Sequence, residues 1–379
     1  MGDANKHLTR KVMVAGHVCL DITPVFSSKD RVKELSEILA PGKLLNVGTA
    51  EINAGGAVAN TGLAMKMLGA DVTLVGKIGK DQFGKLVKDS FLVYGCVSGL
   101  VETSFEDTSY SIVIALPGID RIFLHNPGAN HTFCAEDVDE HLLEDICHFH
   151  LGYPPLMRSL YLNGGSELVA LLKKVKQCGT TTSLDMAAID PNSEAGQVNW
   201  EQILINVLPD VDFFMPSIEE LAYMLDRKTH EQWQELAKGS DITCIINEKD
   251  VWPLAKRVLN MGTSMVMIKC GAQGIFYQTS ETKRMKALCG KHELNLSDWV
   301  EKEGFVEGFY QPKVVSATGA GDTSIAAFLV AMLNGKSLER CVQLAAATGA
   351  CCVATPDALS GLIPLSELEK RIDSGWEKE

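Results

Sequence analysis

The chain has 379 residues, enough for one large α/β domain or two ordinary ones. Its formal net charge of −13 argues against nucleic acid or an anionic membrane surface as a partner, and no apolar run reaches membrane-spanning length. The 11 cysteines are odd in number and form no C-x-x-C pair, so we expect reduced thiols in a cytoplasmic protein.

The first hundred residues alternate strands with helices. Buried strands are predicted at residues 11–16 and 71–76, and helices at 58–68 and 79–94. Residues 24–50 contain prolines and glycine and are expected to be irregular, with a helical piece at 31–39. Short strand–helix–strand connections are typical of parallel α/β folds, and we expect a single domain spanning 1–379.

A hairpin interrupts this alternation. Alternating, β-branched segments at 110–116 and 121–125 flank the turn residues 117–120. We expect a small β-sheet lid, built from segments near 17–52 and 97–130, that projects from the main body. An exposed sheet face of this kind could also pair two copies of the chain, which makes a homodimer through the lid a hypothesis.

The α/β alternation returns after residue 136. Helices are predicted at 136–144, 167–177, 200–208, 218–225 and 252–259, and strands at 181–185, 213–215, 243–247 and 264–269. Residues 281–310 are polar and are expected to be an irregular excursion. A Cys- and Ala-rich helix at 338–354 and a C-terminal helix complete the chain. The fold class expected is α/β, a doubly wound, mostly parallel sheet flanked by helices.

One late stretch combines features of an anion site and a base. Val314 and Val315 are predicted to end a strand, and Gly319, Ala320 and Gly321 follow as a turn that opens an apolar helix. The free N–H groups and positive dipole of a helix start suit phosphate. A carboxylate there, Asp322, makes sense if it removes a proton from an attacking hydroxyl. The alternative is a plain strand–turn–helix corner with Asp322 as a cap.

A glycine-rich turn lies far upstream, from residue 53 to 60. Adjacent Gly55 and Gly56 permit close approach to a ligand, and the amides of Asn53 and Asn60 suit polyol hydroxyls. Asp21 lies near the end of the first strand, where doubly wound sheets bind ligands. The alternative is turn glycines with helix caps. A further stretch, Gly79 to Lys85, resembles a P-loop, but Leu86 replaces the required Ser or Thr.

The early Gly-Gly-x-x-x-Asn turn and the late Gly-Ala-Gly-Asp together resemble the PfkB carbohydrate kinases of the ribokinase-like superfamily. The resemblance covers residues 11 to 365. It implies ATP-dependent transfer of the γ-phosphoryl group to a sugar hydroxyl, on a ribokinase-like fold. Asp322 would be the general base, and the N–H groups of the Gly319–Gly321 turn would form the anion hole. Asp21 would bind the acceptor, together with the residues of the early turn.

The resemblance also implies a nucleotide site. Lys269 begins a loop, Lys-Cys-Gly-Ala-Gln-Gly, that resembles the family's nucleotide loop, with Gly271 and Gly274 near ATP. Thr318, beside the late turn, is expected at the nucleotide as well. Glu220 would orient Mg²⁺ through water, although Ser217 stands where the family has Asn. The family's leading Asp is replaced by Ser316, so dependence on K⁺ is left open.

Two alternatives share this fold. A ribokinase-like nucleoside kinase would use the same base and anion hole with a different acceptor pocket. A non-catalytic sugar-binding protein would keep the pocket without turnover, although retention of Asp322 beside an intact Gly-Ala-Gly turn argues for catalysis.

Overall fold

The computed structural model describes residues 10–27, 40–116, 121–280 and 282–379. The helical piece predicted at residues 31–39 and the hairpin turn predicted at 117–120 therefore lie outside the described residues. None of the helices in the described ranges is both long and apolar enough to cross a membrane.

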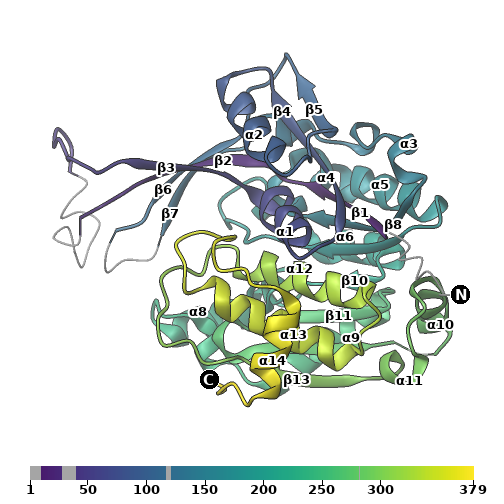
Figure 1. The fold of residues 1–379 in the computed structure, drawn as a ribbon. Helices are drawn as coiled ribbons and strands as arrows, with labels where there is room; N and C mark the ends of the chain where they lie inside the picture. The colour runs from purple at the N-terminus through teal and green to yellow at the C-terminus, as the bar shows by residue number, and fades with distance from the viewer. Residues whose placement is uncertain (1–9, 28–39, 117–120, 281) are drawn as a thin grey trace, which may run out of the picture.

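The described residues form a large central sheet of nine strands (Figure 1). In spatial order the strands are β13 (Glu303–Glu307), β12 (Gly274–Thr279), β11 (Met265–Lys269), β10 (Phe213–Phe214), β9 (Thr181–Asp185), β8 (Ile146–Gly152), β1 (Lys11–Gly16), β4 (Asp71–Gly79) and β5 (Gly99–Thr103). The pairs from β11 to β5 are parallel, whereas β12 and β13 are antiparallel. The predicted doubly wound, mostly parallel sheet is confirmed.

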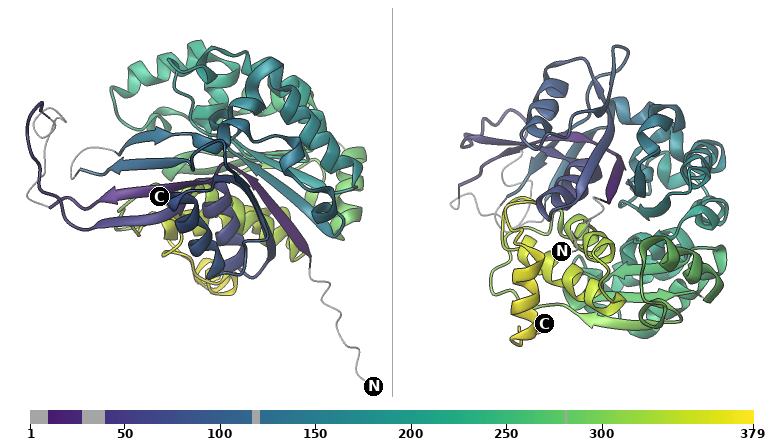
Figure 2. Two further views of the ribbon diagram at one scale, coloured as in Figure 1. Left: turned by 90° about the horizontal axis from the view of Figure 1, so that it is seen from above. Right: turned by 45° about the vertical axis from the view of Figure 1, so that its right-hand side comes forward.

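Successive residues of β1 face opposite sides of this sheet. Val12 and Val14 belong to one hydrophobic core, and Met13 and Ala15 to the other. Helices cover both faces (Figure 2). The first core includes α1 (Gly56–Met67), α12 (Ala320–Leu333) and α13 (Leu338–Cys352), and the second includes α5 (Ser166–Gln177), α6 (Trp200–Val207), α7 (Ile218–Leu225) and α9 (Glu248–Met261).

A smaller four-stranded sheet projects from this body (Figure 1). Its order is β3 (Ala50–Gly55), β2 (Cys19–Pro24), β6 (Tyr110–Ile114) and β7 (Ile122–Asn126). The predicted hairpin is present as the antiparallel pair β6–β7. β2 and β3 lie in the predicted lid segment near 17–52, whereas β5, in the predicted lid segment near 97–130, belongs to the large sheet.

Short helices complete the described fold. They are α2 (Gln82–Leu92), α3 (Glu140–Leu143), α4 (Arg158–Tyr161), α8 (Arg227–Ala237), α10 (Thr282–His292), α11 (Leu296–Trp299) and α14 (Leu365–Asp373). The stretch that resembles a P-loop is the start of α2, where Asp81 caps the helix by accepting a 2.7 Å bond from the Gly84 N–H.

Three sequence predictions were wrong. Residues 243–247 do not form a strand, because Asp241 caps a 3₁₀ turn, Ile242–Ile245, by accepting bonds from Thr243. Of the stretch 281–310 predicted as irregular, the described residues 282–310 carry α10, α11 and β13. Val315 does not end a strand: its N–H donates to the carbonyl of Val353 beyond α13.

Candidate active site

The site forms around the start of α12, where Gly319 adopts the left-handed conformation with φ 78°. A Cβ at this position would lie 2.2 Å from the Cβ of Ala358, so only glycine fits. The Ser316 hydroxyl accepts a 3.1 Å bond from the Thr318 N–H and braces the turn from within.

Only some of the first N–H groups of α12 are available to a ligand. The Ala320 N–H donates to the Ala317 carbonyl at 3.2 Å. The N–H groups of Gly321 and Asp322 have no acceptor among the residues that the structure describes. With the positive end of the helix dipole, these two groups form a potential anion site.

The Asp322 carboxylate is buried and accepts three hydrogen bonds. Thr61 donates its hydroxyl to Oδ1 at 3.0 Å, and Asn60 donates Nδ2 to Oδ2 at 3.2 Å. Tyr153 donates its hydroxyl to Oδ2 at 2.6 Å. Asn60, expected to contact an acceptor hydroxyl, therefore also contacts the expected base.

A small pocket of about 170 Å³ lies on the α1 side of this carboxylate. It is lined by Asp21, Asn53 and Asn60 among others. Asp21 and Asn53 are direct cross-strand neighbours in β2 and β3, which brings their side chains onto one face of the small sheet. The burial of Asp21 raises the pKa of its carboxyl.

The two glycines of the early turn make room for their neighbours. A Cβ on Gly55 would lie 2.1 Å from Oδ2 of Asp21. Gly56 has φ +83°, and its Cβ would lie 2.5 Å from the His17 carbonyl oxygen. Gly55 therefore leaves room for the Asp21 carboxylate, and Gly56 leaves room for the His17 backbone, at the start of α1.

Thr318, which was predicted to lie at the nucleotide, lines the small pocket. Arg121 of the lid lines it too, and the Arg121 guanidinium donates to the Thr318 hydroxyl and, at 3.2 Å, to the Pro356 carbonyl. Arg121 thus links the small sheet to the turn before α12.

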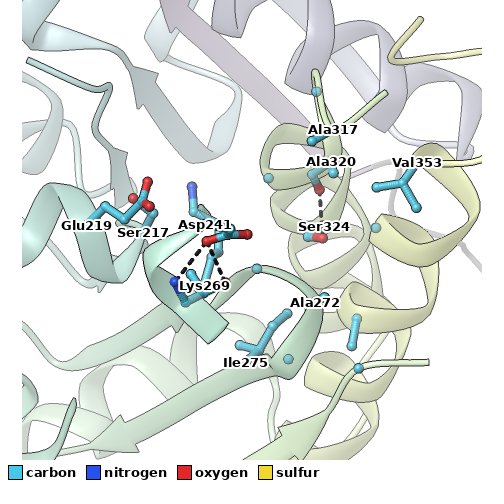
Figure 3. Close-up of a pocket in the computed structure, with 18 of the residues that line it drawn as sticks. Ser217, Glu219, Asp241, Lys269, Ala272, Ile275, Ala317, Ala320, Ser324 and Val353 are labelled. Atoms are coloured by element: carbon cyan, nitrogen blue, oxygen red, sulfur yellow. Dashed lines mark hydrogen bonds between the residues drawn. The ribbon is translucent and has the colours of Figure 1, made fainter. Parts of the chain in front are cut away.

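A larger cleft of about 1100 Å³ lies on the other side of Asp322. Figure 3 shows it between Ser217 and Glu219 at the start of α7 and Ala317 and Ala320 at the start of α12. The predicted nucleotide residues Lys269, Gly271 and Gly274 all line it, as does Glu220.

A buried ion pair crosses the floor of the cleft. Lys269 Nζ lies 2.6 Å from Oδ1 of Asp185 at the end of β9. A Cβ on Gly321 would lie 3.3 Å from the same Nζ, so the ammonium reaches the start of α12. Burial raises the pKa of Asp185 above its usual range, against the opposing effect of Lys269.

The Glu220 carboxylate is partly engaged in the protein. Its Oε2 accepts a 2.7 Å bond from the Ser217 N–H, and the Glu220 N–H donates to Ser217 Oγ at 3.2 Å. This capping box starts α7 and holds Glu220 at the edge of the cleft. Burial raises the pKa of the neighbouring Glu219 to about 6.

Three residues at the site were missed by the sequence analysis: Thr61, Tyr153 and Asp185. Asp185 ends a strand that was predicted correctly, so the rule that ligands bind at strand carboxyl ends could have found it. Tyr153 follows β8, a strand that was not predicted, and nothing in its local pattern points to Asp322.

Comparison with known proteins gives a consistent result. The model of a family described as pfkB family carbohydrate kinase matches residues 10–364. A ribokinase from Arabidopsis thaliana is 23% identical over 344 residues, covering 89% of this chain and 76% of that protein. A 2-dehydro-3-deoxygluconokinase from Bacillus subtilis is 22% identical over 326 residues, covering 85% of this chain and 87% of that protein.

Solved structures agree on the fold. Arabidopsis thaliana ribokinase complexed with ribose and ATP has a TM-score of 0.67 at 20% identity, covering 96% of this chain and 98% of that one. A putative ribokinase II from E. coli in complex with ATP and Mg²⁺ has a TM-score of 0.66 at 21% identity, covering 96% and 99%. From the match to the family model over nearly its whole length, the chain belongs to the pfkB family of carbohydrate kinases.

Proposed function

We propose that the protein transfers the γ-phosphoryl group of ATP to a hydroxyl of a sugar. The observation that carries the proposal is the position of Asp322. Its carboxylate lines the large cleft and contacts Asn60, which lines the small pocket, at 3.2 Å. A base that removes a proton from an acceptor hydroxyl during transfer must lie where the two substrates meet.

The acceptor occupies the small pocket in this proposal. Asp21, Asn53 and Asn60 bind its hydroxyls, while Gly55 leaves room for the Asp21 carboxylate and Gly56 for the His17 carbonyl. Carboxylate and amide groups suit a polyol, because each can bond more than one hydroxyl. The pocket volume of about 170 Å³ lies below the roughly 300–1,000 Å³ of sites for drug-sized ligands. This size favours a sugar over a nucleoside.

The residues of the large cleft fit ATP. Lys269 supplies a cation beside the start of α12, where two N–H groups have no acceptor among the described residues. Gly271 and Gly274 line the cleft without side chains, and Glu220 lies at its edge to orient Mg²⁺ through water. When bound, ATP supplies the phosphoryl group, with part of its charge neutralised by Mg²⁺. The N–H groups of Gly321 and Asp322, the part of the predicted Gly319–Gly321 anion hole and its continuation that has no acceptor among the described residues, stabilise negative charge that develops there.

The experiment is a turnover assay with ATP and Mg²⁺ against a panel of sugars, sugar acids, sugar phosphates and nucleosides. We expect a sugar to be phosphorylated and Asp322→Asn to lower kcat by roughly 10²–10⁴-fold, with acceptor binding retained. Near-normal turnover of Asp322→Asn would remove Asp322 as the base. Turnover of a nucleoside alone would favour the nucleoside kinase, and sugar binding without any turnover would favour the binding protein.

The homodimer through the lid and the cytoplasmic location remain predictions. The dimer is supported by two large apolar side chains exposed on one face of the small sheet, with Ile52 at 50% and Leu124 at 53% exposure. Sedimentation equilibrium of the wild-type chain and of Leu124→Asp tests it. A wild-type monomer at micromolar concentration would contradict the dimer.

A further inference from the structure

Tyr153 contacts the proposed base but belongs to none of the sequence motifs that define the site. Its hydroxyl donates to Oδ2 of Asp322 at 2.6 Å, the shortest of the three bonds to that carboxylate. The other two donors, Asn60 and Thr61, are adjacent residues of α1. Tyr153 reaches the carboxylate from a different element, the end of β8.

The backbone at Tyr153 is unusual. The residue has φ 66° and ψ 44°, in the left-handed region that a bulky side chain seldom adopts. It also precedes Pro154, which restricts it further. The conformation is held by its N–H, which donates to the Asp185 carbonyl at 3.3 Å, and by ring packing against His17 with centroids 6.2 Å apart. Strained residues persist where the surrounding structure holds them, and they cluster at functional sites.

We propose that Tyr153 is a positioning residue that fixes the Asp322 carboxylate for proton removal, which rests on the function proposed above. With bonds from α1 on Oδ1 and Oδ2 and from Tyr153 on Oδ2, the carboxylate cannot rotate without losing a donor. One acceptor position on Oδ1 remains for the substrate hydroxyl, because a carboxylate has about four.

The charges around Tyr153 keep it a donor. Burial, followed by the nearby carboxylates of Asp322 and Asp185, raises the pKa of its phenol, so the hydroxyl stays protonated at neutral pH. Glu220 acts in the same direction. Lys269 forms its ion pair with Asp185, and burial lowers the pKa of His17 to about 3, which leaves that ring neutral.

The test is Tyr153→Phe, which removes the hydroxyl and keeps the ring. We expect kcat to fall roughly 10- to 100-fold, with the KM values of ATP and sugar changed less than about threefold. The acidic limb of the kcat–pH profile should move to higher pH, because the carboxylate loses a donor that stabilises its charged form. Tyr161→Phe is the matched control: Tyr161 is buried outside both pockets and its hydroxyl donates to Glu194 at 3.4 Å, so all of these quantities should stay at wild-type values. Wild-type kcat and pH profile in Tyr153→Phe would overturn the inference.

A second measurement needs no turnover. Urea unfolding of Tyr153→Phe, Asp322→Ala and the double variant forms a double-mutant cycle. We expect the shift in midpoint of the double variant to be smaller than the sum of the two single shifts, and full additivity would contradict the pairing. Loss of turnover in Asp322→Asn together with wild-type turnover in Tyr153→Phe rejects the inference alone. A wild-type chain that phosphorylates no acceptor rejects the proposed function and, with it, the catalytic purpose of the pair.

Discussion

Position 55 requires glycine because the Asp21 carboxylate occupies the space that a side chain would need. A Cβ on Gly55 would lie 2.1 Å from Oδ2 of Asp21, far inside van der Waals contact. Gly55→Ala must therefore displace the carboxylate that we expect to bind the acceptor. We predict a roughly 10-fold or larger rise in the acceptor KM with the KM of ATP unchanged, and the same direction of change for Asp21→Ala.

Steady-state kinetics with each substrate varied in turn measure this effect. Gly290→Ala is the matched control, because a Cβ on Gly290 in α10 has nothing within 4 Å. If Gly55→Ala raised the KM of ATP instead, the placement of the acceptor at Asp21 would be wrong.

At the scale of single residues, the sequence singles out those whose proposed role depends on local backbone conformation. Gly319 and Gly56 have positive φ, and Asp322 follows directly in the helix, so local pattern was sufficient to single them out. Tyr153 could not be found in this way. It meets Asp322 across 169 positions of sequence, through a left-handed turn after a strand that was not predicted.

The element on which the proposed chemistry depends most is the start of α12. Gly319 precedes it with φ 78° and with Ala358 packed against its Cα. We predict that Gly319→Ala lowers both kcat and the melting temperature, since the Cβ would meet the Ala358 Cβ at 2.2 Å and the turn must open. The left-handed conformation alone costs an alanine about 1–2 kcal/mol.

Gly335→Ala separates these two causes. Gly335 also has positive φ, 74°, but a Cβ there meets nothing within 4 Å. Calorimetry and turnover of both variants should show a similar backbone cost in each, with an additional loss of stability and of kcat in Gly319→Ala only. Equal kcat in the two variants would mean that the turn does not shape the site.

Helices and strands were predicted correctly where the capping residues and the apolar pattern of the same segment indicate the same element. The helix Ile218–Leu225 and the strand Thr181–Asp185 were predicted with their observed bounds. The strand β8 was missed because His148 and His150 interrupt its apolar pattern. Thr181 and Ser183 of the neighbouring strand bond both ring nitrogens of His148 and Nδ1 of His150, contacts that local sequence does not reveal.

At the scale of the whole molecule, the described residues form two sheets with helices on both faces of the larger one (Figures 1 and 2). Asp322 lines the large cleft and bonds Asn60, which lines the small pocket proposed for the acceptor. Membership of the pfkB family confirms the predicted fold class and the prediction of a sugar kinase. The ordered set of motifs along the chain was sufficient for both. The identity of the sugar depends on pocket shape, which the motifs do not encode.

The large sheet also holds a chain of buried polar side chains between β8, β9 and α10. Thr181 Oγ1 lies 2.7 Å from His292 Nε2 and 2.8 Å from His148 Nδ1, and Ser183 Oγ joins His148 Nε2 to His150 Nδ1, both at 2.8 Å. Burial lowers the pKa of each of these histidines, to about 4 for His292 and about 3 for His150. In the folded protein these three histidine rings are therefore neutral at pH 7.

This network predicts loss of stability in mild acid. An unfolded histidine takes up a proton below about pH 6.5, whereas His292 in the folded protein does so only near pH 4. Because the unfolded state binds more protons in this window, stability falls as pH is lowered, by about 1.4 kcal/mol per pH unit for each such histidine.

His292→Gln removes one contribution and keeps a side chain that can bond Thr181. Urea unfolding at pH 7 and pH 5 should show the wild type losing about 2 kcal/mol more than the variant between the two conditions. Equal losses would mean that His292 carries its proton in the folded state as well, and that the network is charged.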